Sequence, residues 1–554
     1  MQLDSSHIWQ HGRFQTDLQR QTNVVDNLSV VRGRHQLKFG VDYRRLFPIF
    51  DRVAYLQNVT FTGVNSVLTG RATRITVQAF DGPRFPVFNN LSVFVQDNWK
   101  VTPRLLLTYG SRWELNPAPS ESRGKDPFAV TSLDNLAALA VAPVGTPIFK
   151  TRYNNFAPRV GVAYQLSQEK GRELVLRGGF GVFYDLGIGT IASAFGSSFP
   201  YSRQKQVNNV IFPLDPVAAA PPVFNPSPPF STLNGVVDPN FELPYTYQWN
   251  VAIERSLGFN QVVSAAYVAA VGRRLARQEL ISAPAPGFGS VLLTRNSGTS
   301  DYHALQLQLQ RRLFKGLQYV ASYTWSHSLD NVSVDSSFEA PITKIDPQQE
   351  RGPSDFDVRH ALNGAVTYDL PIPFDHGMGN LLLRNFSIDS IFSARSATPV
   401  NVTGGAGAGG LFVSRPDLIE GVPLYIQDST VAGGRRINSA AFKIPVGRQG
   451  TLGRNLLRGF SAWQIDFGLR RRFKLTEQVN LQLRAEFFNI FNHPNFGDPG
   501  SAGSGTNALT NPLFGRSTVT LGRSLGSGGG GGGFNPLFQI GGPRSIQLAL
   551  RLNF

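Results

Sequence analysis

The segment LSVFVQDNWKVTPRLLLTYGSRWELN, residues 91–116, contains the pattern that decides the fold. Two runs alternate their side chains with a period of two, and the short stretch 101–104 separates them. In the second run one face is apolar and the other polar, with Leu107, Tyr109 and Trp113 opposed to Thr108, Arg112 and Glu114. A strand that faces lipid on one side and a wet lumen on the other requires this alternation. The segment therefore predicts a hairpin of a membrane β-barrel.

The same hairpin pattern recurs along the chain. Alternating runs form six further pairs, most of them joined by a short turn: 24–31 with 35–45, 158–166 with 173–184, 245–255 with 261–272, 302–312 with 317–328, 358–369 with 384–395, and 463–473 with 478–491. Long connections separate most successive pairs, at 47–90, 186–244, 331–357, 396–460 and 493–543. In outer-membrane barrels the short turns face the periplasm and the long loops face outside. We therefore predict an all-β, antiparallel transmembrane barrel, with roughly 15–16 recognisable strands.

The composition fits membrane strands and does not fit membrane helices. Hydrophobic residues make up 41% of the chain, and none of its stretches approaches the roughly 18 consecutive apolar residues of a spanning helix. Cysteine is absent, which excludes disulfides and thiolate metal sites. The eight histidines form no HxH or HExxH cluster, so we expect neither a metal nor another cofactor.

The formal net charge of +16 raises the question of nucleic-acid binding. The basic residues are spread among the alternating runs rather than gathered in long blocks, as Arg112, Arg177, Arg470, Arg484 and Arg551 illustrate. An arginine on the lipid face of a barrel costs about 2–4 kcal/mol at the membrane midplane. We therefore expect these arginines to face the lumen, and we expect no nucleic-acid partner.

The C-terminal segment PRSIQLALRLNF, residues 543–554, tests this scheme. One face carries Ile546, Leu548, Leu550, Leu552 and Phe554, and the chain ends on that phenylalanine. Counted from the last short turn, this strand runs toward the periplasm. An alternating strand with a terminal aromatic resembles the signal read by the barrel-assembly machinery, so we predict that these five residues form that assembly signal.

Several stretches resemble TonB-dependent outer-membrane receptors, and the Oar-like group in particular. They are VRGRHQLKFGVDYRR (31–45), LSVFVQDNWKVTPRLLLTYGSRWE (91–114), FAPRVGVAYQL (156–166), LRGGFGVFYD (176–185), PYTYQWNVAIER (244–255), YVASYTWSHSLDN (319–331), FDVRHALNGAVTYDLP (356–371), LRAEFFNIFNHPNFG (483–497) and the C-terminal segment. The resemblance implies a barrel of about 22 strands, closed by an N-terminal plug that engages TonB. We expect residues 1–554 to be one barrel domain that is N-terminally truncated, without the plug or a signal peptide.

Three features of the sequence invite a chemical interpretation. The stretch GAGAGG, residues 405–410, matches GxGxxG, but no helical periodicity follows it, so we predict a loop. His327 lies between Ser326 and Ser328, yet neighbours on a strand point to opposite faces, so we expect no catalytic triad and no enzyme. Tryptophans lie in or beside predicted strands and indicate an interfacial girdle, with ligand stacking as the alternative: Trp99, Trp113, Trp249, Trp325 and Trp463.

These observations predict a protein of the outer membrane of a Gram-negative-type bacterium. The resemblance implies the barrel of a TonB-dependent transporter that takes up a large or scarce solute through the lumen. The expected partners are outer-membrane lipid, the barrel-assembly machinery, the TonB complex through the plug, and a solute that the sequence does not identify. The alternative is a passive porin-like barrel, or a structural or adhesive one.

Overall fold

A computed structural model describes residues 7–11, 16–51, 54–61, 64–186, 188–197, 201–223, 228–282, 285–333, 350–371, 384–405, 415–446, 448–500, 505–524 and 541–554. Nearly all regular structure in these ranges is β-strand. Within them, the helices are all too short or too polar to cross a membrane. The fold is therefore the all-β architecture that the alternating runs predict.

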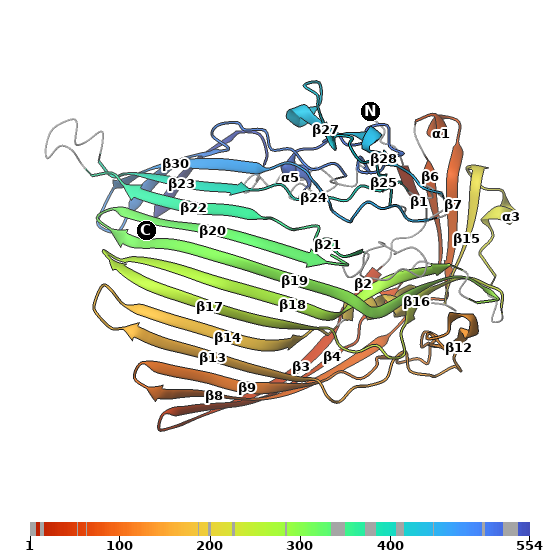
Figure 1. Ribbon diagram of the computed structural model, residues 1–554, viewed down its shortest axis with the longest axis horizontal. Helices are drawn as coiled ribbons and strands as arrows, with labels where there is room; N and C mark the ends of the chain where they lie inside the picture. Colours follow the sequence, from red (N-terminus) through yellow and green to blue (C-terminus); the bar gives the residue numbers. More distant parts are fainter. Residues whose placement is uncertain are drawn as a thin grey trace.

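One antiparallel meander of fifteen strands dominates the described residues. Each strand pairs with the next in this order: β3 (Gln21–Arg32), β4 (His35–Leu46), β8 (Pro86–Thr102), β9 (Leu105–Leu115), β13 (Phe156–Ser167), β14 (Leu174–Tyr184), β17 (Tyr245–Gly258), β18 (Gln261–Ser282), β19 (Phe288–Phe314), β20 (Leu317–Asp330), β22 (His360–Asp369), β23 (Phe386–Arg395), β30 (Ala462–Lys474), β31 (Asn480–Phe488) and β32 (Ser545–Asn553). The wall curls into a barrel with short turns at one end and long loops at the other (Figure 1). The number of strands confirms the estimate from the sequence.

Three short strands extend the same sheet without continuing the wall. β10 (Ser120–Glu121) pairs with β8, β16 (Phe230–Val237) runs parallel to β19, and β21 (Gly352–Pro353) pairs with β20. The wall itself ends at β3 and β32. Within the described residues, each of these two strands pairs with one neighbour only, so both edges are open.

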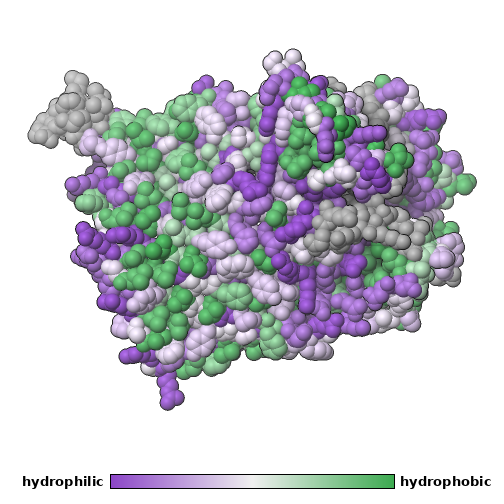
Figure 2. All heavy atoms as spheres, in the orientation of Figure 1, coloured by the Kyte–Doolittle hydropathy of each residue, from purple (hydrophilic) through white to green (hydrophobic). Residues whose placement is uncertain are grey.

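The alternation in the sequence becomes a two-faced wall. On β19, Leu305, Leu307 and Leu309 share one face, and the register places Leu305 beside Tyr267 on β18 and Trp325 on β20. Gln306, Gln308 and Gln310 share the opposite face. A band of hydrophobic residues crosses the wall when the barrel is seen from outside (Figure 2). The apolar face is therefore the outer face, and the glutamines line the inside.

The tryptophans follow the same rule. Register places Trp99, Trp113, Trp249, Trp325 and Trp463 on the apolar, outer face of their strands. Near the short turns Trp99 stacks on His35, with ring centroids 5.3 Å apart. Toward the long loops Trp463 stacks on His493 at 4.2 Å. These placements agree with the predicted girdle at both edges of the apolar band.

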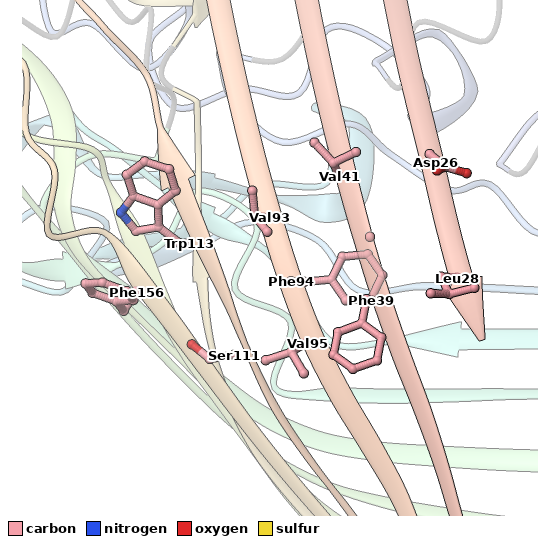
Figure 3. Close-up of a pocket in the computed structure, with 11 residues that line it drawn as sticks. Asp26, Leu28, Phe39, Val41, Val93, Phe94, Val95, Ser111, Trp113 and Phe156 are labelled. Atoms are coloured by element: carbon pink, nitrogen blue, oxygen red, sulfur yellow. The ribbon is translucent and has the colours of Figure 1, made fainter. Parts of the chain in front are cut away.

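A shallow groove of about 660 Å³ marks the outer face near the β3 edge (Figure 3). Its lining comes from β3, β4, β8, β9 and β13 and includes Phe39, Val41, Val95 and Trp113. Asp26 of β3 also lines it, on the same face as these apolar side chains.

Gly110 of β9 lies close to β8, because a Cβ there would be 2.4 Å from the Val95 carbonyl oxygen.

The long loops contain folded structure of their own. A separate sheet has the order β1 (His7–His11), β6 (Tyr55–Phe61), β7 (Arg71–Phe80) and β15 (Ser202–Ile211), and it projects from the loop end (Figure 1). Two-stranded pairs are β2 (Thr16–Leu18) with β5 (Ile49–Asp51), β11 (Val130–Thr131) with β12 (Ala140–Val141), β24 (Pro399–Val400) with β29 (Leu457–Arg458), β25 (Asp417–Leu418) with β28 (Phe442–Lys443), and β26 (Tyr425–Gln427) with β27 (Arg435–Ile437). Short helices are α1 (Val64–Leu68), α2 (Ile188–Ser197), α3 (Pro216–Ala219), α5 (Leu521–Ser524), η1 (Leu136–Ala138), η4 (Ala432–Gly434) and η5 (Ser439–Ala441).

One hairpin is much longer than its alternating runs indicate. β18 and β19 have 22 and 27 residues and continue past the wall, so residues 273–282 and 288–301 are strand as well. Their extension is stabilised by burial, since Val291 and Leu293 are 0% and 1% exposed in an apolar cluster with Phe230 of β16. The sequence pattern missed this extension because its strands are buried by loop residues and do not alternate apolar with polar.

Candidate functional site

The inner wall of the barrel is the candidate site, and strand alternation builds it. The central strands β18, β19 and β20 present uncharged polar groups to the lumen. Gln308 of β19 lies between Ser264 and Ser322, and Gln306 lies beside Thr324. Amide and hydroxyl groups of this kind donate and accept hydrogen bonds without a charge. This part of the wall therefore fits a neutral, strongly hydrated surface.

Charged residues occupy the inner wall on either side of this neutral region, and several of them form ion pairs. Arg112 of β9 contacts Glu114 at 2.5 Å and Asp42 of β4 at 3.4 Å. Ser92 Oγ donates to Glu114 at 2.6 Å. These contacts compensate the charges within a surface that is partly removed from water.

The predicted lumen position of the five arginines is confirmed by the register of their strands. Besides Arg112, Arg177 pairs with Glu254 at 3.3 Å, Arg470 with Asp389 at 2.5 Å, and Arg484 with Glu486 at 2.5 Å. Arg551 lies opposite Gln482 on the same inner face. All five lie on the side opposite the apolar band, so the basic composition does not contradict a membrane-facing wall.

A cavity of about 430 Å³ opens on the inner wall between β20 and β31. Its lining combines apolar side chains with polar and charged ones: Val320, Ile391 and Phe488 with Ser322, Asn363, Asp389, Asp466, Arg484 and Glu486. Ile391 is 57% exposed, so it offers an apolar contact to the lumen. An apolar contact surrounded by a few convergent polar groups is typical of a ligand-binding site.

The carboxylates of this cavity already have partners in the protein. Asp466 accepts from Gln464 Nε2 and from the Asn489 amide, both at 2.8 Å. Asp389 accepts from Thr367 Oγ1 at 2.7 Å in addition to Arg470. The cavity therefore suits a solute held by hydrogen bonds and apolar contact better than one held by an uncompensated charge.

A buried ionic network fastens the long loops to the barrel rim. The Arg454 side chain is 0% exposed and contacts Asp330, at the end of β20, and Asp355, at 3.0 Å for the latter. Arg458 Nη2 lies 2.6 Å from Asp357, whose side chain is 1% exposed. Burial alone would raise the pKa of the Asp357 carboxyl, but hydrogen bonds from the Ser328 amide, Arg458 and His327 outweigh burial and hold that pKa below its ordinary value. These contacts therefore favour the ionised carboxylate in the docked loop.

Apolar packing narrows the loop end of the barrel. Leu46 and Phe88 face each other on β4 and β8, on the inner side, and both are buried. Helix α2 packs against them through Ile191 and Phe195, and the Phe88 and Phe195 rings meet edge to face at 6.1 Å. The helix is thus held against the inner face of β4 and β8 at the loop end.

The residues that invited a catalytic interpretation have structural partners. His327 faces outward and contacts Asp357 at 3.2 Å and Arg359 at 3.0 Å. Ser326 and Ser328 lie on the other face, where Ser328 Oγ bonds Ser354 Oγ at 2.7 Å. The alternation of faces agrees with the prediction. Among the described residues, no group of three or more His, Asp or Glu side chains is arranged to hold a metal.

Two other predicted features have different outcomes. Ile546, Leu548, Leu550 and Leu552 are exposed along one face of the edge strand β32, and Phe554, which follows the strand, is exposed too. The role of these five residues as an assembly signal stays a prediction. The stretch 405–410 lies outside the described residues except for Gly405, so its predicted loop is not tested.

Comparison with known proteins identifies the family. The model of the outer membrane beta barrel domain matches residues 4–529. The chain belongs to the outer membrane β-barrel domain family. It resides in the outer membrane of a Gram-negative bacterium, and its apolar outer band faces lipid. No curated protein sequence matches the chain.

Solved structures of outer-membrane proteins are similar to the chain at low sequence identity. The outer membrane transporter YddB from Escherichia coli is 9% identical with a TM-score of 0.51, over 97% of this chain and 54% of that one. The ferric citrate transporter FecA is 10% identical at 0.46, over 100% and 56%. The ferric enterobactin receptor PfeA from Pseudomonas aeruginosa is 10% identical at 0.44, over 97% and 63%. The chain thus spans little more than half the length of these proteins, and at this identity the likeness concerns the fold.

Sequence reasoning found the inner arginines but missed the cavity and the ionic network. The cavity draws on five strands separated by up to about 170 residues, and the network joins Asp330 to Arg454 across 124 positions. None of these residues stands out in its own segment. Only co-variation between distant positions could have indicated them.

Proposed function

We propose that this chain forms the wall of a TonB-dependent outer-membrane transporter that takes up a large or scarce solute. The observation that carries the proposal is the polar, internally paired inner wall with a cavity open to the lumen. A solute would contact Ile391 and the polar groups around it on its way through. The proposal includes a plug and further wall strands contributed by the same protein, in line with the open edges at β3 and β32.

The loop end supports transport over free diffusion. Helix α2 packs on inward-facing residues of β4 and β8, an arrangement that favours a restricted entrance over a wide open one. The loops are also fastened by a buried network, which suits a surface that selects a solute. The projecting sheet of β1, β6, β7 and β15 favours the adhesive alternative, because it stands clear of the barrel (Figure 1).

Uptake assays separate these functions. We expect a deletion strain to lose accumulation of one member of a panel of labelled ferric chelates, corrinoids, glycans and peptides, and a strain lacking TonB to show the same loss. Accumulation that persists without TonB, together with a steady ohmic conductance in planar bilayers, would instead establish a passive pore. Loss of surface attachment with unchanged uptake would establish the adhesive function.

A cavity variant locates the solute path. Ile391→Trp fills the cavity from an exposed position, so the fold should persist while solute affinity falls at least tenfold. The matched control is Val262→Trp, which adds the same ring on the inner face of β18, where Val262 is 42% exposed. Equal affinity in both variants and the wild type would contradict a role for the cavity.

A further inference from the structure

The positive charge of the chain is concentrated at the short-turn end of the barrel. The described turns and strand ends there contain fifteen basic and five acidic residues, a net +10, against +16 for the whole chain. The basic residues are Arg32, Arg34, Lys100, Arg104, Lys170, Arg172, Arg255, Arg311, Arg312, Lys315, Arg384, Arg471, Arg472, Lys474 and Arg551. The acidic residues are Glu169, Glu173, Glu254, Asp369 and Glu477. Hydrophilic residues line this end of the molecule in Figure 2.

Four of these arginines point outward, toward the membrane. Strand alternation and register place Arg32, Arg255, Arg311 and Arg471 on the apolar face, and we call these four residues the basic belt. On β19, Arg311 continues the row of Leu307 and Leu309. The belt therefore borders the apolar band rather than the lumen.

Three carboxylates near the belt are directed away from it or bound elsewhere. Glu254 and Asp369 lie on the inner face of their strands. Asp97 also faces outward, but it lies deeper in β8 than the strand ends counted above; it is 4% exposed and is bound by His35 at 2.7 Å and by Tyr109 at 2.9 Å. The belt arginines therefore face the membrane interface on the side that Glu254 and Asp369 do not occupy.

Aromatic rings hold two of the belt guanidinium groups at this boundary. Arg471 lies 4.5 Å from the Phe473 ring centroid and 5.0 Å from that of Phe386. Arg311 lies 5.4 Å from the Phe314 ring, and its Nη2 donates to the Phe314 carbonyl at 3.2 Å. Aromatic side chains and long basic ones favour the depth of the lipid headgroups, where stems contact hydrocarbon and charges contact water.

We propose that the basic belt binds the phosphate groups of anionic phospholipids in the periplasmic leaflet of the outer membrane. A guanidinium presents two parallel donors that match phosphate oxygens. Basic residues at a membrane surface are attracted to anionic headgroups. The acyl chains of the same lipid would lie along the leucines and valines of the outer wall. A ligand with both a phosphate and hydrocarbon chains covers both halves of this surface, whereas a soluble acidic peptide covers one.

Lipid retention tests the proposal. The full chain, purified from outer membranes and placed in nanodiscs of phosphatidylcholine with or without phosphatidylglycerol, is analysed by native mass spectrometry for bound lipid. We expect the wild type to retain phosphatidylglycerol, and the triple variant R255Q/R311Q/R471Q to retain roughly tenfold less. The matched control R74Q/R123Q/R295Q removes three exposed arginines from the loop end and should retain lipid like the wild type.

Further experiments separate a loss of lipid binding from a loss of folding, and identify the chemistry of the ligand. The triple variant with lysine at the three belt positions should restore most retention, and heat-modifiable migration on gels reports folding for each variant. Equal phosphatidylglycerol retention by folded wild type and glutamine variant would overturn the proposal. Competition by inorganic phosphate or glycerophosphoglycerol at lipid-like concentrations would assign the belt to phosphate alone. Belt-dependent binding of a polyglutamate peptide in phosphatidylcholine would assign it to an acidic protein segment.

Discussion

Replacing Arg454 by methionine should release the loop that carries it from the barrel rim. The Arg454 side chain is 0% exposed and that of Asp330 is 2% exposed, and Asp355 and Ser333 complete the cluster. Removing one partner of a buried pair leaves the other charge without compensation, which costs about 3–5 kcal/mol. Since about 1.4 kcal/mol corresponds to a factor of ten, the opening equilibrium of the loop should shift on the order of a hundred- to a thousandfold. The β-barrel itself should stay folded, because the cluster involves only the last residue of β20 and the loop residues beyond it.

Hydrogen exchange of the backbone amides around residues 450–458 measures this opening, and heat-modifiable migration reports the barrel. A double-mutant cycle with Asp330→Asn isolates the pair. We expect the double variant to be more stable than the sum of the single changes by about 2 kcal/mol, because the second change removes the isolated carboxylate. Additive effects within about 0.5 kcal/mol, or unchanged exchange in Arg454→Met, would refute the reasoning.

Three further predictions concern pH, assembly and close packing. Burial raises the pKa of the Asp498 carboxyl, so its contribution to loop stability is present below its ordinary pKa and is lost as pH rises through the raised value. In the wild type, hydrogen-exchange protection of the loop should therefore be greater at acidic pH, and Asp498→Asn should remove this difference. An unchanged pH profile in the variant would contradict the prediction. Phe554→Gln should reduce assembly into the outer membrane, whereas Asn553→Ser on the inner face should not, as judged by heat-modifiable migration and surface labelling of loops. Gly110→Ala should destabilise the barrel by about 1–3 kcal/mol because its Cβ meets backbone at 2.4 Å, while Gly161→Ala, with its nearest contacts at 3.8 Å, should leave the urea midpoint nearly unchanged.

The sequence by itself determined the class of fold and the direction of the side chains. A period of two is a local property of a strand, so Leu305 and Gln306 are assigned to opposite faces by their spacing alone. The same rule placed Arg112 and the tryptophans correctly. Turn length also predicted which end of the barrel faces the periplasm and which faces outside, since short turns and long loops alternate along the chain.

Tertiary structure decided what the loops do and where a solute can bind. The extension of β18 and β19 depends on burial by Phe230, which lies more than 30 positions away from either strand. The cavity around Ile391 and the Arg454–Asp330 pair likewise join segments that are far apart in sequence. Desolvation and ion pairing act through space, so their strength is fixed only when the chain has brought those groups together. The local pattern therefore specifies a two-faced wall, while the chemistry of its entrance depends on contacts that no single segment contains.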